Sequence, residues 1–340
     1  MAVHIRSHAK INLGLAIGPL RADGFHSLTT LYQTLALHDL VTVEARRTAA
    51  NSITLTSNHP RVPTDASNTA WRMVERALAE LGVPAEVHIH IEKRLPVQGG
   101  LGGGSANAVA ALLGLERELG PELESPIAAC RRFKIAEEIG SDVPLFLLGG
   151  AVVGRGRGEQ VTPLPELPSV PCVLALPEIG VSTPQAFRDW DALQAASQTA
   201  NSNSLTDLPP SATIDELSRL IASVFGAPHS SGVFSEREGR AETPLLALVR
   251  TGIENDFEPV VFSQYPFLGE IKRILLGGTG TEDEAICAAL SGSGSALYGL
   301  YSTAAAAQAA LERLHAYGVA GVLTRTLPRR EYWGGLWVDG

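Results

Sequence analysis

The sequence predicts a mixed α and β protein made of two domains. Its 340 residues are enough for two ordinary domains and a large core. Segments with the two-residue alternation of strands are interspersed with segments that carry the apolar stripe of a helix. A proline cluster at Pro163, Pro165 and Pro168 interrupts this pattern and predicts a domain boundary. We therefore expect one domain over residues 1–165 and a second over residues 170–328.

The first domain begins with extended segments and continues with a helix. Residues 3–20 alternate apolar and polar side chains, and residues 31–44 resume an extended pattern after a turn. A further strand is expected over residues 53–57. Residues 68–81 predict a helix because their apolar side chains fall on one side. That stripe consists of Ala70, Met73, Val74, Ala77, Leu78 and Leu81.

A glycine-rich loop follows the next predicted strand, residues 87–91, and precedes a helix expected to end near Leu119. Glycine lets backbone N–H groups approach an anion closely, and a helix N-terminus adds unpaired donors. The loop, residues 96–107, therefore predicts a phosphate-binding site. A flexible linker is the alternative, but linkers are seldom flanked by a patterned strand and helix. Its glycines are Gly99, Gly100, Gly102, Gly103 and Gly104.

This loop matches neither of two well-known phosphate-binding patterns. A Walker loop needs Lys and then Ser or Thr directly after its last glycine, but Ser105 stands where the lysine belongs. The dinucleotide-binding pattern G-x-G-x-x-G fails because its last position falls on Ser105 or Asn107. The sequence therefore predicts a third kind of glycine loop.

The rest of the chain is expected to be mixed as well. After a helix over residues 127–139, the glycines at 154, 156 and 158 predict a tight β-turn in preference to a second phosphate site. The expected elements of the second domain are a strand over 173–176, a polar surface excursion over 197–243 with one short helix over 214–224, a helical or extended segment over 271–276, a glycine turn over 291–295, a helix over 304–315 and a strand over 319–327.

Composition narrows the function classes. The chain carries 27 basic and 36 acidic residues, a net charge of −9, and has no dense basic tract, which disfavours broad nucleic-acid binding. No apolar run approaches the ~20 residues of a spanning helix, so no membrane partner is expected. The three cysteines are far apart and lack metal-site spacing, which favours a reducing, cytoplasmic compartment.

Five separated stretches together resemble the GHMP kinases, a family of ATP-dependent small-molecule kinases. Three of them are the glycine loop, residues 10–13 and residues 291–296. The other two, Arg-Ala-Asp-Gly-Phe-His at 21–26 and Gly-Ser-Asp-Val-Pro-Leu-Phe at 140–146, resemble the branch whose substrate is a cytidine diphosphate-linked methylerythritol. Each stretch alone is unspecific, whereas the ordered set is specific.

The resemblance implies a fold and a reaction. The fold is α+β, with an N-terminal unit like ribosomal S5 domain 2, a ferredoxin-like C-terminal domain, and ATP and substrate in the cleft between them. The reaction moves the γ-phosphoryl group of ATP to the tertiary 2-hydroxyl of the methylerythritol unit, a step of non-mevalonate isoprenoid biosynthesis. The implied cofactors are ATP and Mg²⁺, and the protein ligands of the metal stay unknown.

The resemblance also assigns a catalytic pair. Asp142 is implied to be the general base, because a carboxylate near an alcohol can take its proton. Lys10 is implied to orient this carboxylate and to stabilise developing negative charge. Without the resemblance, the sequence pattern predicts that Asp142 is a turn or helix-cap carboxylate and that Lys10 is a solvated lysine on a strand. Asn12 shares the strand face of Lys10 and is expected to donate to substrate hydroxyls.

Two further sets of binding residues follow from the resemblance. Phe25 and Phe187 are expected to stack on the cytosine, and His26 to bond its edge. The full substrate set is Asn12, Phe25, His26, Thr183 and Phe187. The ATP set is Pro96, Val97, Gln98, Gly99, Gly100, Leu101, Gly102, Gly103, Gly104, Ser105, Ala106, Asn68 and Lys93.

Two alternative functions remain open at this point. One is another GHMP kinase, acting on homoserine, mevalonate or a sugar; the other is an RNA-binding protein built on the S5-like unit. Phe25 and His26 favour a base-containing small molecule, because homoserine, mevalonate and sugars offer no base to stack on. The acidic balance disfavours RNA. The sequence leaves the oligomeric state unknown.

Overall fold

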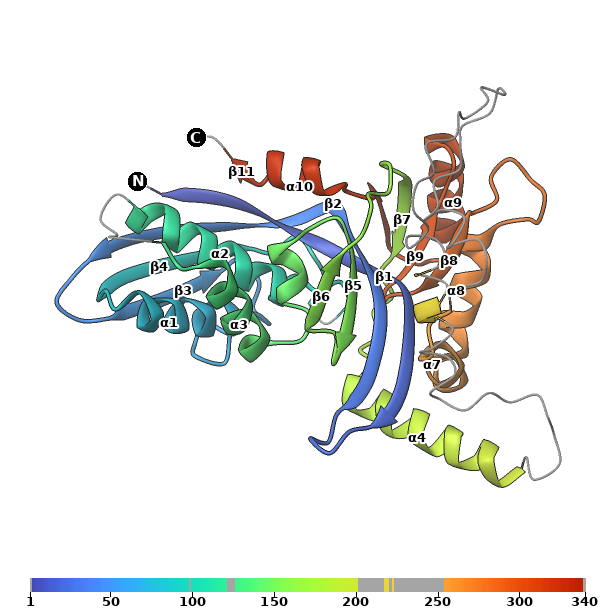
Figure 1. The fold of residues 1–340 in the computed structure, drawn as a ribbon. Coiled ribbons are helices and arrows are strands. Elements are labelled where there is room, and N and C mark those ends of the chain that lie inside the picture. The colour runs from blue at the N-terminus through green and yellow to red at the C-terminus, as the bar shows by residue number, and fades with distance from the viewer. Residues whose placement is uncertain are drawn as a thin grey trace, which may run out of the picture.

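The computed structural model describes residues 2–97, 99–120, 126–200, 217–219, 222 and 254–338. Gln98, which is predicted to contact ATP, lies outside the described residues. So does most of the predicted excursion over 197–243, with most of its predicted helix over 214–224. The described residues form two sheets with helices packed on them (Figure 1). Within these ranges, no helix combines the length and apolar character that spanning a bilayer requires.

A long antiparallel hairpin is the base of the first sheet. Its strands are β1 (Val3–Leu20) and β2 (His26–Arg47). The elements that follow are β3 (Ser52–Ser57), α1 (Thr69–Leu81), β4 (Ala85–Glu92), α2 (Gly103–Leu119), α3 (Ala129–Ile139), the 3₁₀ helix η2 (Pro144–Leu147), β5 (Ala151–Gly156) and β6 (Gln160–Pro163). The three α-helices lie together on one face of the sheet (Figure 1).

The second sheet has the strand order β10-β7-β9-β8. Its elements and their neighbours are β7 (Pro171–Ala175), α4 (Thr183–Ala200), α7 (Glu258–Gln264), α8 (Pro266–Leu276), β8 (Cys287–Leu290), β9 (Leu297–Leu300), α9 (Ala304–Ala316), β10 (Gly321–Arg325), α10 (Arg329–Gly334) and β11 (Trp337–Val338). The last strand, β11, does not join this sheet but pairs with β1. The first sheet therefore has the order β11-β1-β2-β4-β3, and in addition β5 pairs with β2 and β6 pairs with β5.

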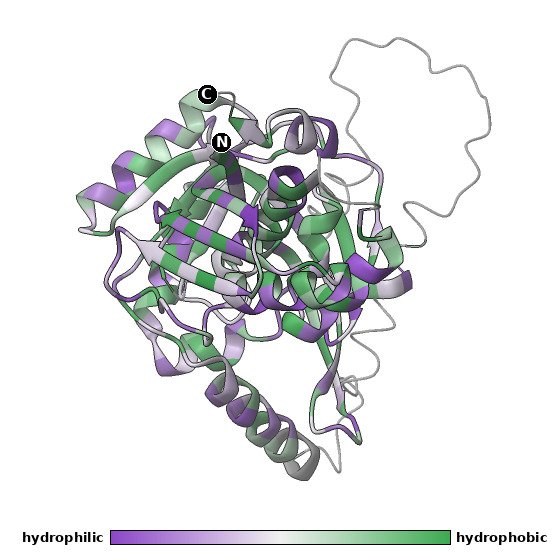
Figure 2. Cartoon of the chain, turned by 90° about the vertical axis from the view of Figure 1, so that its left-hand side faces the viewer, coloured by the Kyte–Doolittle hydropathy of each residue, from purple (hydrophilic) through white to green (hydrophobic). Residues whose placement is uncertain are grey.

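Local sequence patterns explain the elements that were predicted most closely. In α1 the Asn68 side chain accepts the N–H of Ala70 at 2.8 Å, and Gly82 ends the helix in the left-handed conformation. The apolar stripe of α1 faces the core, as the helical spacing predicted. In β4, buried Ile89 alternates with exposed His88 and His90. Figure 2 shows the same alternation of apolar and polar bands along the strands.

The β1–β2 hairpin connects the two halves of the protein. Along β1, Ile5 belongs to the core under α1 and α2, Ile11 to a second core, and Ile17 to a third core under α8 and α9. The N–H of Leu15 donates to the carbonyl oxygen of Glu254 at 3.0 Å, which fastens the strand to the chain before α7. A single strand therefore runs through every core cluster.

Several elements differ from the sequence-based expectations. The segment over 271–276 is the second part of α8, which begins earlier, at Pro266. Neither α4 nor β8 was predicted, because α4 is balanced between apolar and polar residues and β8 is only four residues long. The predicted turn at 154–158 is the β5–β6 turn, where the N–H of Gly158 donates to the carbonyl oxygen of Arg155 at 3.0 Å.

Gly114 lies in the interior of α2 at a point where a methyl group has no room. A Cβ there would lie 2.7 Å from Cγ2 of Val43 and 2.9 Å from Cδ1 of Ile5. We expect Gly114→Ala to lower the free energy of unfolding by about 1–3 kcal/mol, although alanine favours helices. Gly120→Ala, at the end of the same helix with no atom of the described residues within 4 Å of the new Cβ, is the control. Equal urea midpoints for the two variants would contradict this expectation.

His8 should make stability depend on pH. Burial, and then the neighbouring His38, lower the pKa of His8 from 6.5 to about 3. Between the folded pKa of about 3 and the unfolded pKa of 6.5, the unfolded chain binds a proton on His8 that the folded chain does not. The contribution of neutral His8 to the free energy of unfolding is therefore complete above pH 6.5 and is lost as the pH falls below it. We expect His8→Asn to reduce the loss in free energy of unfolding between about pH 7 and 5 by roughly 1–2 kcal/mol. Urea titrations at both pH values measure the free energy of unfolding. The same loss between the two pH values in His8→Asn as in the unsubstituted protein would refute this expectation.

Candidate active site

The glycine loop leaves the first turn of α2 open to a ligand. Gly102 precedes the helix with a φ of 70°, a left-handed conformation that suits glycine. Ala106 makes the first helical bond, its N–H donating to the carbonyl oxygen of Gly102 at 2.9 Å. No side chain among the described residues caps α2, so the N–H groups of Gly103, Gly104 and Ser105 remain as donors. With the positive end of the helix dipole, they can hold an anionic group.

Both halves of the protein hold this loop in place. From the first sheet, the N–H of Lys10 donates to the carbonyl oxygen of Leu101 at 3.0 Å. From the second half, the hydroxyl of Ser291 donates to the carbonyl oxygen of Gly100 at 3.0 Å. Because its carbonyl groups are engaged in this way, the loop is held with its amide groups near the start of α2.

The two other predicted ATP residues line the same cavity as the loop, a space of about 370 Å³. Asn68 shapes its wall, because the side chain that caps α1 also donates to the carbonyl oxygen of Pro63 at 2.7 Å. The ammonium group of Lys93 lies at its other side, close to the first residue of α2.

Asp39 is part of this region and was not predicted. It is fully buried and accepts Nζ of Lys93 at 2.5 Å. Its other oxygen accepts the N–H groups of Arg94 and Leu95 at 2.8 Å each. The carboxylate therefore aligns the backbone that enters the loop. The available signal was an aspartate between the apolar residues Leu37 and Leu40 of β2, next to His38.

Lys10 and Asp142 are in contact at the centre of the molecule. Nζ of Lys10 lies 3.2 Å from Oδ2 of Asp142 and donates to Oδ1 of Asn12 at 2.6 Å. Only 3% of the lysine side chain is exposed, against 32% of the aspartate side chain. The ammonium group is thus shielded from bulk water, while part of the carboxylate stays open to the space in front of it.

The register of the β1–β2 hairpin places these groups together. Along β1, Lys10 and Asn12 project from the face opposite to Ile11 and Leu13, which are buried in the core. Asn12 pairs with Tyr32 on β2, and paired residues of antiparallel strands share a face. One face of the hairpin therefore carries the lysine, the amide and the phenol.

Tyr32 reaches the second oxygen of the Asp142 carboxylate and was not predicted. Its hydroxyl donates to Oδ1 of Asp142 at 2.9 Å. Burial, and then the charge of Asp142, raise the pKa of Tyr32 well above 10, so the phenol stays protonated and donates. The signal in the sequence was the two-residue spacing of Thr30, Tyr32 and Thr34, which predicts one polar face on β2.

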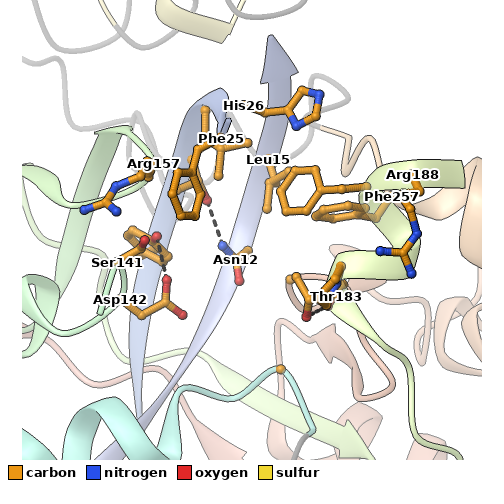
Figure 3. Close-up of a pocket in the computed structure, with 18 of the residues that line it drawn as sticks. Asn12, Leu15, Phe25, His26, Ser141, Asp142, Arg157, Thr183, Arg188 and Phe257 are labelled. Carbon is orange, nitrogen blue, oxygen red and sulfur yellow. Dashed lines mark hydrogen bonds between the residues drawn. The ribbon is translucent and has the colours of Figure 1, made fainter. Parts of the chain in front are cut away.

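A cleft of about 570 Å³ opens in front of Lys10 and Asp142. Asn12 and Asp142 project into it from one side, and residues of α4 with Phe257 form the other side (Figure 3). Gly100 lines both this cleft and the smaller cavity at the loop, so the two spaces meet at the glycine loop.

The second glycine turn, residues 291–295, lies beside the ion pair. A Cβ added at Gly292 would lie 3.7 Å from Nζ of Lys10. The hydroxyl groups of Ser293 and Thr183 are 2.7 Å apart and form a hydrogen bond, which ties this turn to the start of α4. Thr183 therefore lines the cleft and connects α4 to the second glycine turn.

Aromatic side chains gather at the far end of the cleft. Phe25 is 52% exposed, and the guanidinium group of Arg157 lies 4.9 Å from its ring centroid. His26 is buried and stacks on Phe187, with ring centroids 5.0 Å apart and an interplanar angle of 4°. Its Nε2 donates to Oδ1 of Asp191 at 2.8 Å. The imidazole thus covers one face of Phe187, whereas Phe25 presents its ring to the cleft (Figure 3).

This arrangement suits transfer of a phosphoryl group. The open helix N-terminus can hold phosphates, the carboxylate can accept a proton, and the buried ammonium group can stabilise negative charge between them. Among the described residues, no group of three or more His, Cys, Asp or Glu side chains could hold a metal ion.

Comparisons with known proteins identify the family of the chain. A family model described as the GHMP kinases N terminal domain matches residues 68–150, and one described as GHMP kinases C terminal matches residues 242–320. The chain is 36% identical to the 4-diphosphocytidyl-2-C-methyl-D-erythritol kinase of Solibacter usitatus, over 92% of this chain and 85% of that protein. The protein of the same name from Moorella thermoacetica is 33% identical, over 94% and 98% of the two chains.

Solved structures give the same result. A crystal structure of 4-(cytidine 5'-diphospho)-2C-methyl-D-erythritol kinase matches with a TM-score of 0.65 and 29% identity, covering 95% of this chain and 98% of that one. A homoserine kinase from Cytophaga hutchinsonii shares the fold, with a TM-score of 0.65 at 19% identity, covering 96% and 95% of the two chains. The fold is the two-domain α+β fold of these ATP-dependent small-molecule kinases. The chain belongs to the GHMP kinase family, in the branch of the 4-diphosphocytidyl-2-C-methyl-D-erythritol kinases.

Proposed function

We propose that this chain transfers the γ-phosphoryl group of ATP to the 2-hydroxyl of 4-diphosphocytidyl-2-C-methyl-D-erythritol, a step of non-mevalonate isoprenoid biosynthesis. Family membership supports the kinase activity and the substrate. The observation that carries the proposal is the ion pair of Lys10 and Asp142 at the point where the cleft meets the phosphate-binding loop.

In this proposal Asp142 is the general base. A tertiary alcohol is a crowded and weak nucleophile, so its attack depends on alignment and on a proton acceptor. The exposed part of the Asp142 carboxylate receives the proton as the new O–P bond forms. Lys10 keeps the carboxylate in place and stabilises the negative charge that develops on the transferred group. Asn12 is oriented by Lys10 and Thr30, and it binds a hydroxyl group of the substrate.

ATP occupies the cavity at the glycine loop. Its phosphates accept the N–H groups of the first turn of α2, and Lys93 adds a positive charge beside them. Mg²⁺ bound to the triphosphate would neutralise phosphate charge, and the Ser105 hydroxyl is the loop oxygen that would contact it or a phosphate. The first contacts in this cavity are backbone donors, which do not depend on the side chain of Ala106.

The cytidine end of the substrate occupies the aromatic end of the cleft. The base stacks on Phe25, and His26 bonds its edge. Homoserine and mevalonate have no ring for this surface, which supports the cytidine-linked substrate over theirs. We place the reaction in the cytoplasm, in keeping with three free cysteines at Cys130, Cys172 and Cys287.

Asp142→Asn tests the general base. We expect kcat to fall by about 10²–10⁴-fold, because the amide cannot accept the proton, while the nucleotide dissociation constant stays unchanged. A coupled ADP-release assay with the diphosphocytidyl substrate measures the rate, with homoserine and mevalonate in parallel. Asp189→Asn, on the exposed side of α4, is the control and should retain full activity. Full activity of Asp142→Asn would contradict the assignment of Asp142 as the general base. Equal turnover of homoserine would contradict the proposed diphosphocytidyl substrate.

Phe25→Ala tests the stacking surface. Loss of one base–ring contact should weaken the substrate by about 1–3 kcal/mol, seen as a higher KM at unchanged kcat. Phe25→Tyr keeps the ring face and should behave like the unsubstituted protein. Phe267→Ala removes another exposed ring, which stacks on Tyr317 away from the cleft, and should leave KM unchanged. A normal KM for Phe25→Ala would remove the stacking role.

A further inference from the structure

We propose that Tyr32 is a positioning residue for phosphoryl transfer, whose hydroxyl fixes the orientation of the Asp142 carboxylate toward the acceptor alcohol. This inference rests on the proposed function of the site. It names a residue outside the predicted catalytic pair and assigns a purpose to the glycine-rich turn between β5 and β6.

The two oxygens of Asp142 have different partners. Oδ2 lies 3.2 Å from Nζ of Lys10, and Oδ1 accepts the hydroxyl of Tyr32 at 2.9 Å. Asp142 belongs to the short turn between α3 and η2, so no helix or strand fixes its side chain. A carboxylate held at one oxygen can rotate about that contact, whereas two contacts from neighbouring strands leave one orientation. The phenol therefore supplies the second point of attachment.

The position of the phenol is itself constrained by the β5–β6 turn. The Tyr32 side chain is only 2% exposed. A Cβ at Gly158, where φ is 105°, would lie 2.5 Å from the Tyr32 hydroxyl oxygen, and a Cβ at Gly154 would lie 2.6 Å from its ring. Both positions therefore require glycine for the ring to fit. The turn encloses the phenol and leaves its hydroxyl directed at Asp142.

Tyr32 also contacts the other member of the ion pair. Nζ of Lys10 lies 5.5 Å from the centroid of the Tyr32 ring, within the range of a cation–π contact. One side chain thus touches both Lys10 and Asp142. Tyr32→Phe separates the two contacts, because it keeps the ring beside the ammonium group and removes only the hydroxyl.

The surrounding charges decide what Tyr32→Phe changes. Among the described residues, the titratable side chains that contact Asp142 are Lys10 on β1 and Tyr32 on β2. Glu159 and Arg157 on the β5–β6 turn lie further out, the first near the phenol and the second in the wall of the cleft. Tyr32→Phe leaves all of these except the phenol unchanged. A change in kcat would therefore come from the lost hydroxyl.

The test compares Tyr32→Phe with Tyr301→Phe. The control loses an equally buried hydroxyl, which donates to the carbonyl oxygen of Leu275 at 2.7 Å, remote from the ion pair. For Tyr32→Phe we expect kcat to fall by roughly 10- to 100-fold, the range for one hydrogen bond to a charged group. The KM values for ATP and the diphosphocytidyl substrate should stay within about twofold of the unsubstituted protein, because the ring stays in the wall of the cleft and the lost hydroxyl is engaged by Asp142.

The loss in Tyr32→Phe should fall on kcat with both KM values nearly unchanged, a split that a merely structural role would not produce. Tyr301→Phe should match the unsubstituted protein in kcat, and similar melting temperatures would show that both variants fold. An unchanged kcat in Tyr32→Phe, or a change in KM alone, would overturn the role of Tyr32 while the proposed function stands. Absence of turnover in the unsubstituted protein would overturn the proposed function and this inference together.

Discussion

The burial of one ammonium group is the constraint on which the site depends. Removing a lysine from water costs several kcal/mol unless nearby groups accept its protons. Lys10 meets this requirement with Asp142 and Asn12, and its stem packs against the backbone of Gly102, where a Cβ would lie 2.9 Å from Cγ. The same requirement draws together a turn, a strand and the glycine loop. The charge that we propose for catalysis thus also organises the structure around it.

The β1–β2 hairpin explains how this charge is held steady. Because β1 passes through all three cores, its middle is anchored at both ends by packed apolar residues such as Ile5 and Ile17. The ion pair is therefore built on a rigid element shared by both sheets. The aromatic end of the cleft differs, because Phe25 lies on the exposed turn of the hairpin and Asp191 on α4. The rigidly held ion pair and the more exposed aromatic side chains thus lie at opposite ends of one cleft.

How accurately the sequence predicted each element or contact depends on how far apart in the chain the interacting residues lie. Elements with a local pattern, such as α1 and β4, were predicted closely, whereas α4 was not, because Ala186 and Trp190 are buried only by tertiary contacts. The contact of Lys10 with Asp142 followed from family resemblance and not from any pattern. Tyr32 was missed because its partner is 110 residues away, and a contact at that separation leaves no local periodicity.

The late return of the chain to its first strand has a consequence for biosynthesis. His4 pairs with Val338, and the guanidinium group of Arg6 donates to the carbonyl oxygen of Trp337 at 3.2 Å. A ribosome makes residues 329–338 after all the other strands of the first sheet. Until then the outer edge of β1 has unpaired backbone groups, which invite pairing with other nascent chains. This edge of β1 therefore stays open to other chains until residues 337–338 have been synthesised.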